Sequence, residues 1–72
     1  MTEPRTEIDT EALLRKPIWT VEELAAFLSL PVKTIYKLRA EGKLCAGYRV
    51  GRWLRFKRED VLRWLETRRD EA

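Results

Sequence analysis

A chain of 72 residues has room for a single domain with a modest hydrophobic core. Hydrophobic residues make up 44% of the sequence and charged residues 38%. This composition excludes a chain that is disordered over its whole length, and it predicts a compact fold with a very polar surface. No stretch is long and apolar enough to cross a bilayer, and the polar N-terminus lacks the apolar run of a secretory signal. We therefore expect a cytoplasmic protein without a membrane partner.

The net charge of +3 hides an uneven distribution along the chain. Residues 31–58 contain nine lysines and arginines and one acid, Glu41, for a net charge of +8, whereas residues 1–17 carry three bases and four acids. A surface that is merely solvated normally mixes both signs. A basic block beside a slightly acidic segment instead predicts one face that binds phosphates.

The reactive residue types give no support for catalysis. The sequence has no histidine, and its one cysteine, Cys45, can form neither an internal disulfide nor, without histidine, a structural zinc site. The acidic pairs Glu22/Glu23 and Glu59/Asp60 each fall in the first turn of an expected helix, where capping and the helix dipole explain them. We expect a protein that is not an enzyme and that uses no cofactor, metal or small-molecule ligand.

Residues 1–17 are expected to form a flexible polar arm ahead of the domain. Their one apolar cluster, residues 12–14, is followed by Pro17. Two alternatives stay open for this segment. Either Thr10 caps a short helix that includes the apolar cluster, or the chain has no regular structure until Ile18.

Two short helices are predicted next. Thr20 followed by Glu23 forms a capping box that starts the first of them, and the sequence Ser-Leu-Pro at residues 29–31 interrupts it. The second begins near Pro31 and runs to about residue 41, because proline is tolerated in a first turn and Gly42 is a favourable residue just after a helix end. Two helices joined by about three residues predict a helix-turn-helix.

After Gly42 the pattern alternates, which indicates a β-hairpin. The alternation separates two sets of side chains, apolar Tyr48, Val50, Leu54 and Phe56 on one face and Arg49 and Arg55 on the other. A three-residue loop at 51–53 places Val50 opposite Leu54 on the buried face. A two-residue turn pairs Val50 with Trp53 and is expected to turn Leu54 outward, so we favour the longer loop.

A third helix is expected after Lys57, with acids in its first turn and Arg68 and Arg69 near its end. The domain is then predicted to span residues 18–69, and residues 70–72 are predicted to fray. The fold class is mostly α with a small β-hairpin, arranged as a winged helix-turn-helix.

This arrangement offers two sets of candidate DNA contacts. A second helix laid in the major groove presents Lys33, Thr34, Tyr36 and Lys37. For the lysines the alternative is ordinary solvated charge, and for the tyrosine it is a partly buried packing role. The hairpin presents Arg52 at its tip to a minor groove, with Arg49 and Arg55 placed to clamp phosphates.

Trp53 is expected to be exposed on this hairpin. Exposed aromatic side chains usually mark contact surfaces. Three roles stay open for it: packing along a deoxyribose, contact with a neighbouring protomer, or folding back over the first helix of the pair.

Several stretches of the sequence together form a family pattern. They are TVEELA at 20–25, TIYKL at 34–38 with EGKL at 41–44, RVGR at 49–52 with LRF at 54–56, and REDV at 58–61 with WL at 64–65. With this pattern, residues 19–65 resemble the excisionase-type helix-turn-helix domains, relatives of the MerR winged-helix group. The chain departs from the usual pattern at Pro31, where a capping serine is common, and at Cys45, where proline is common.

The resemblance implies a MerR-like or excisionase-like winged helix that binds and bends double-stranded DNA, with head-to-tail contacts between protomers on neighbouring sites. It also implies a bacterial host. The leading hypothesis for the function is an excisionase that directs a partner integrase toward excision of a phage or mobile element. By position, the four residues of the second helix would read the major groove and Arg52 would be the wing-tip residue. The alternatives are a small MerR-like transcriptional regulator, or an adaptor that binds protein through Trp53, the acidic arm and the last helix.

Overall fold

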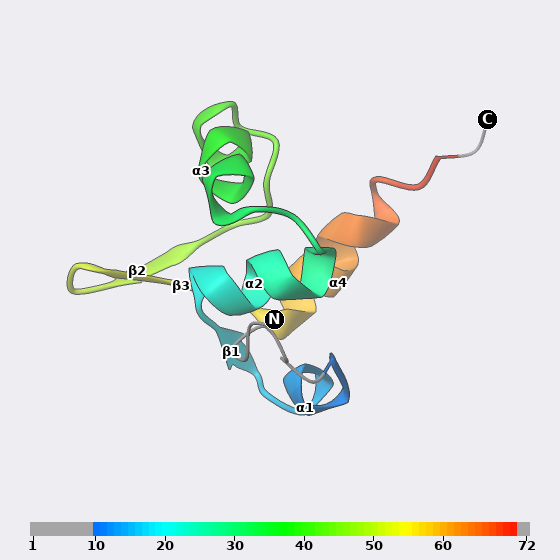
Figure 1. Ribbon diagram of the computed structural model, residues 1–72, viewed down its shortest axis with the longest axis horizontal. Helices are drawn as coiled ribbons and strands as arrows, with labels where there is room; N and C mark the ends of the chain where they lie inside the picture. The colour runs from blue at the N-terminus through cyan, green and yellow to red at the C-terminus, as the bar shows by residue number, and fades with distance from the viewer. Residues whose placement is uncertain (1–9, 71–72) are drawn as a thin grey trace, which may run out of the picture.

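A computed structural model describes residues 10–70 of the chain. Within them the elements are α1 (Thr10–Leu14), β1 (Ile18–Trp19), α2 (Val21–Leu28), α3 (Val32–Ala40), β2 (Tyr48–Val50), β3 (Trp53–Lys57) and α4 (Arg58–Glu66). The strands form an antiparallel sheet in the order β1-β3-β2. The β2–β3 hairpin, which we call the wing, projects from the body, and α1 and α3 lie at opposite ends (Figure 1). The predicted fold class is confirmed.

Side chains from six elements, all but β2, meet in one core. The largest fully buried ones are Trp19, Leu24, Ile35, Phe56 and Val61. Burial of apolar surface is the main force that holds such a small domain together, and among the described residues no charged or polar side chain is buried. The helices and the sheet are therefore positioned by this single apolar cluster.

The helix-turn-helix forms from local signals that the sequence contains. The Thr20 hydroxyl accepts a hydrogen bond from the Glu23 amide at 3.0 Å, and the Glu23 carboxylate accepts one from the Thr20 amide at 2.9 Å, which confirms the capping box. Ser29, in the left-handed conformation with φ 59°, ends α2. Pro31 precedes the first turn of α3, and Gly42, with φ +73°, follows its end. Both predicted helices are confirmed.

The segment before β1 packs on the body. α1 buries Leu13, whose carbonyl accepts a hydrogen bond from the indole N–H of Trp19 at 2.9 Å. Arg58 of α4 donates its guanidinium to the Leu14 carbonyl at 2.6 Å and its amide to the Pro17 carbonyl at 2.9 Å. The carbonyl groups at the end of α1 are thus satisfied by donors from β1 and α4.

This packing corrects the predicted flexible arm over residues 10–17. Within the described residues the packed structure extends back to Thr10, eight residues before the expected boundary at 18, because distant donors hold the end of α1. Of the two alternatives for this segment, the short helix is confirmed, with Thr10 as its first residue. The remainder of the arm, residues 1–9, lies outside the described residues.

α4 stops at Glu66, so Arg68 and Arg69, expected near the end of this helix, lie two and three residues after it. The Thr67 hydroxyl donates to the Trp64 carbonyl at 2.6 Å, a local bond of the kind that competes with helix continuation. Within the expected frayed tail, residue 70 is exposed and residues 71–72 lie outside the described part of the chain.

The wing has a different register from the predicted one. Its Cα partners are Tyr48 with Arg55, Arg49 with Leu54, and Val50 with Trp53. The connection is therefore a two-residue turn, with Gly51 at φ +67° in its first position. The predicted three-residue loop, with Val50 opposite Leu54, is wrong.

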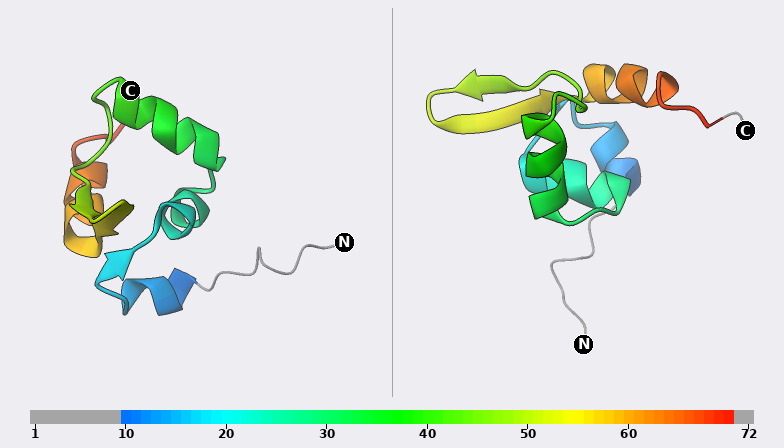
Figure 2. Two further views of the ribbon diagram at one scale, coloured as in Figure 1. Left: turned by 90° about the vertical axis from the view of Figure 1, so that its left-hand side faces the viewer. Right: turned by 90° about the horizontal axis from the view of Figure 1, so that it is seen from above.

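The reason for this error is that β2 does not lie over the core. All of its residues are exposed, so their alternation carries no information about burial, and the wing extends beyond the helices (Figure 2). The expectation that a two-residue turn would turn Leu54 outward is also wrong. Leu54 and Phe56 both point inward from β3, and a Cβ at Gly47 would lie only 3.0 and 3.2 Å from their side chains. The residue before β2 is a glycine because these two side chains fill the space beside it.

A matched pair of truncations tests this register. Leu54 is 8% exposed and Val50 is 64% exposed. We expect Leu54→Ala to lower the free energy of unfolding by about 2 to 5 kcal/mol because it leaves a cavity. Val50→Ala should stay within about 0.5 kcal/mol of the parent. Urea unfolding followed by circular dichroism measures both, and equal losses would indicate that Val50 faces the core as the three-residue loop requires.

Candidate nucleic-acid interface

The two faces of α3 differ sharply. Ile35 is fully buried against α2, while Lys33, Tyr36 and Lys37 are exposed on the outer side. Tyr36 keeps 51% of its surface accessible, so it is not a packed core residue. Thr34 lies half-buried in the first turn of the helix. The polar face that the sequence assigns to contact with DNA is therefore available to a partner.

The wing carries its arginines in two different states. The side chains of Arg49 and Arg52 are exposed and, within residues 10–70, form no hydrogen bond or ion pair. Arg55 is half-buried and donates to the Leu54 carbonyl at 2.9 Å. Its guanidinium lies 6.0 Å from the centre of the Trp53 ring, a cation–π distance. Arg49 and Arg52 are thus the wing cations with the most freedom to bind phosphates.

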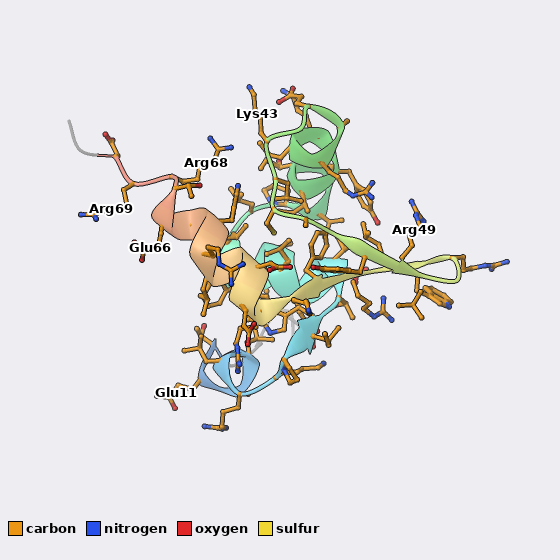
Figure 3. All side chains as sticks on the ribbon, turned by 180° about the vertical axis from the view of Figure 1, so that it is seen from behind. Glu11, Lys43, Arg49, Glu66, Arg68 and Arg69 are labelled. Atoms are coloured by element: carbon orange, nitrogen blue, oxygen red, sulfur yellow. The ribbon has the colours of Figure 1, made fainter. Side chains whose placement is uncertain are left out.

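A hollow of about 330 Å³ lies between the wing, α3 and the start of α2. Tyr36 contributes to it from α3, and Arg49, Arg52 and Arg55 contribute from the wing. Arg49 projects from the hairpin toward the side on which α3 stands (Figure 3). Tyr36 and the three wing arginines, far apart in sequence, therefore share one concave and basic surface, whereas Lys33, Thr34 and Lys37 are not among the residues that line it.

Two further side chains modify this surface. Trp53, as predicted, is exposed, with 60% of its surface accessible, and it also lines the hollow. The exposure is larger than folding back over α2 would leave. Glu22, at the start of α2, lines the same hollow and adds one negative charge near the three arginines. Neither α3 nor the wing contains an acid of its own, so the negative charge of Glu22 leaves the surface as a whole basic.

Cys45 and the acidic side chains are the other candidates for reactivity in the described part of the chain. Burial raises the pKa of the Cys45 thiol to about 11, and the neighbouring Asp60 carboxylate adds to the rise, so the thiol stays protonated at neutral pH. Within residues 10–70, no three Cys, Asp or Glu side chains come together to hold a metal ion. None of the helices in this part of the chain has the length and hydrophobicity to cross a membrane.

Sequence reasoning missed one contact at the base of the wing. The Tyr48 hydroxyl donates to the Asp60 carboxylate at 2.7 Å, which joins β2 to α4. In the sequence, Tyr48 belongs to the apolar alternation and Asp60 to the first turn of a helix. Neither pattern signals a hydrogen bond between residues twelve positions apart.

A basic helix-turn-helix beside an arginine-rich hairpin defines a DNA-binding protein with a wing. The sequence model described as "Helix-turn-helix domain" matches residues 20–69, which is most of the chain. This protein therefore belongs to the helix-turn-helix domain family, and its partner is double-stranded DNA. No curated protein and no solved structure matches it significantly.

Proposed function

We propose that this protein is an excisionase, which binds adjacent DNA sites, bends them and directs a partner integrase toward excision of a phage or mobile element. The observation that carries the proposal is the shared surface of Tyr36 on α3 with Arg49, Arg52 and Arg55 on the wing. The matched helix-turn-helix family is associated with excisionase-like DNA-binding proteins. The resemblance of residues 19–65 to excisionase-type domains supports the same role.

In this proposal α3 lies in the major groove. Lys33 and Lys37 donate to guanine or phosphate oxygens, and Thr34 contacts a phosphate or a thymine methyl. The Tyr36 hydroxyl donates to a phosphate while its ring packs on a sugar. These assignments use the exposed face of the helix and leave its buried face, with Ile35, in the core.

The wing then reaches the next minor groove. Arg52 enters the groove, where the negative potential attracts arginine, and Arg49 and Arg55 bind the phosphates on its edges. Trp53 packs along a deoxyribose beside them. A rigid protein that occupies two successive grooves favours duplexes that curve toward it, so bending follows from the same contacts.

The protein itself would act without catalytic activity. It shapes the DNA, and the integrase breaks and rejoins the strands. Head-to-tail contacts between protomers on neighbouring sites would extend the curvature. The cytoplasm of a bacterial host is the compartment in which such an integrase meets its DNA.

Two charge-removing variants test the two halves of the interface. We expect Lys37→Ala and Arg52→Ala each to weaken binding to a duplex selected from a random-sequence library by about tenfold, and to reduce the slope of log affinity against log salt by about one. Arg15→Ala removes the same charge after α1, at the end of the body opposite α3 (Figure 2), and should change affinity by less than about twofold. Fluorescence anisotropy at several salt concentrations measures all three. An unchanged affinity for both interface variants would contradict this docking.

Trp53 offers a spectroscopic test of the wing. Trp19 is fully buried and Trp64 is half-buried, so acrylamide quenching of the free protein should come mainly from Trp53. We expect a duplex with a single binding site to reduce this quenching, because the ring packs against sugar. Trp53→Phe should abolish the DNA-dependent change. Protection that required two adjacent sites on the duplex would instead indicate contact with a neighbouring protomer.

The excisionase role is tested by recombination in vitro. With the integrase of the same genetic element and a DNA carrying both element junctions, the protein should raise the yield of excised circle above that of integrase alone. Arg52→Ala should need a higher concentration for the same yield, because its affinity for DNA is lower. DNA binding at promoter sites with no effect on excision would favour the transcriptional regulator.

A further inference from the structure

The outer strand of the wing, β2, buries no side chain against the body. All residues of β2 are exposed, whereas β3 buries Leu54 and Phe56 in the core. β2 is joined to β3 by three residue pairs. A short edge strand without a buried side chain moves easily about its base unless another contact restrains it.

One side chain of β2 supplies such a contact. The Tyr48 hydroxyl donates to Asp60 Oδ2 on α4 at 2.7 Å, and the Tyr48 ring lies 5.4 Å from the Lys57 ammonium. Within the described residues, no other β2 side chain forms a hydrogen bond or ion pair with the body. Tyr48 thus joins the free edge of the wing directly to a helix of the core.

The acceptor is itself held in place. Asp60 Oδ1 accepts from the Arg63 guanidinium at 3.2 Å, so the two carboxylate oxygens point to different donors. The Asp60 side chain is only 19% exposed. Hydrogen bonding to this carboxylate favours the protonated hydroxyl and raises the pKa of Tyr48. Tyr48 therefore stays protonated at neutral pH and acts as the donor.

We propose that the Tyr48–Asp60 hydrogen bond is a latch that holds the wing at a set angle to α4 and so positions Arg52 for DNA. Tyr48 is a positioning residue in this proposal and does not itself touch DNA. The proposal rests on the DNA interface described above. The donor and the acceptor of this hydrogen bond both belong to this chain, and the expected effect of the bond is on the position of the wing tip.

The length of the wing turns a small rotation into a large displacement. The five residues of β3 span about 15 Å from base to tip, so a rotation of about 10° at the base moves the tip by about 2.5 Å. A displacement of that size is enough to break a guanidinium–phosphate hydrogen bond. Exposed polar contacts contribute little to global stability. We therefore expect the loss of the Tyr48–Asp60 hydrogen bond to alter the position of the wing and to leave the core folded.

The first test uses the free protein. Tyr48→Phe keeps the ring and its contact with Lys57 but removes the donor, and Asp60→Ala removes the acceptor. Both should increase motion of the amides of residues 48–54 in ¹⁵N relaxation and relaxation-dispersion measurements. Glu59→Ala removes the neighbouring acid from the same turn of α4 and should leave the wing unchanged. Wing amides that stay as rigid in both variants as in the parent would overturn the proposal.

The second test is a double-mutant cycle on DNA affinity, with the selected duplex as probe. Tyr48→Phe should weaken binding by about three- to tenfold in the parent and by less than about twofold in the Arg52→Ala background, because the latch acts through Arg52. Equal losses in both backgrounds would show that Tyr48 acts independently of the wing tip, and no loss in the parent would show that it does not position the wing; either overturns the proposal.

The two tests also separate this proposal from the proposed function. If Arg52→Ala itself binds like the parent, the DNA interface is wrong and the latch has no role in binding. The relaxation measurements still decide whether Tyr48 restrains the wing. If Arg52→Ala weakens binding and Tyr48→Phe does not, the interface stands and only the latch is wrong.

Discussion

Phe56 lies fully buried on β3, and the rest of the structure depends on how this residue packs. Its strand pairs with Trp19 of β1 on one edge and with β2 of the wing on the other. α4 begins directly where β3 ends. The wing, the last helix and the segment leading into α2 all take their positions from this one strand. Because protein interiors are close-packed, β3 has little room to shift.

The loop after α3 is also joined to the body, through hydrogen bonds to α4 and the residues after it. The Lys43 carbonyl accepts hydrogen bonds from the Trp64 indole and from the Arg68 guanidinium, each at 3.1 Å. Both donors belong to α4 or to the residues just after it. The far end of α3 is thus connected to α4, while Ile35 holds its buried face in the core. The proposed major-groove helix and the wing are carried by one body, so their spacing is set by packing.

Unpaired positive charge distinguishes the outer side of α3 and the wing from the rest of the surface. Ion pairs neutralise three basic residues elsewhere, at Lys16–Glu23, Lys43–Glu41 and Arg63–Asp60. The cations on the outer side of α3 and at the tip of the wing have no such partner among the described residues. Their mutual repulsion is relieved when phosphates bind, which is a strong driving force at low salt. The same wing exposes Val50 and Trp53, and an apolar patch beside unpaired arginines suits a partner with both sugars and phosphates.

The sequence by itself determined the features that act over three or four residues or through composition. The capping box at Thr20, the stop at Gly42 and the basic block over residues 31–58 all predicted correctly where the helix-turn-helix forms and which face carries charge. Only the tertiary structure decided the register of the wing, the packing of α1 and the bond between Tyr48 and Asp60. The α1 packing and the Tyr48–Asp60 bond depend on contacts between residues that are 6 to 44 positions apart, and no local pattern reports which distant side chain will be present to receive them. The wing register joins residues only 3 to 7 positions apart, but it was misread because the exposed residues of β2 carry no burial signal.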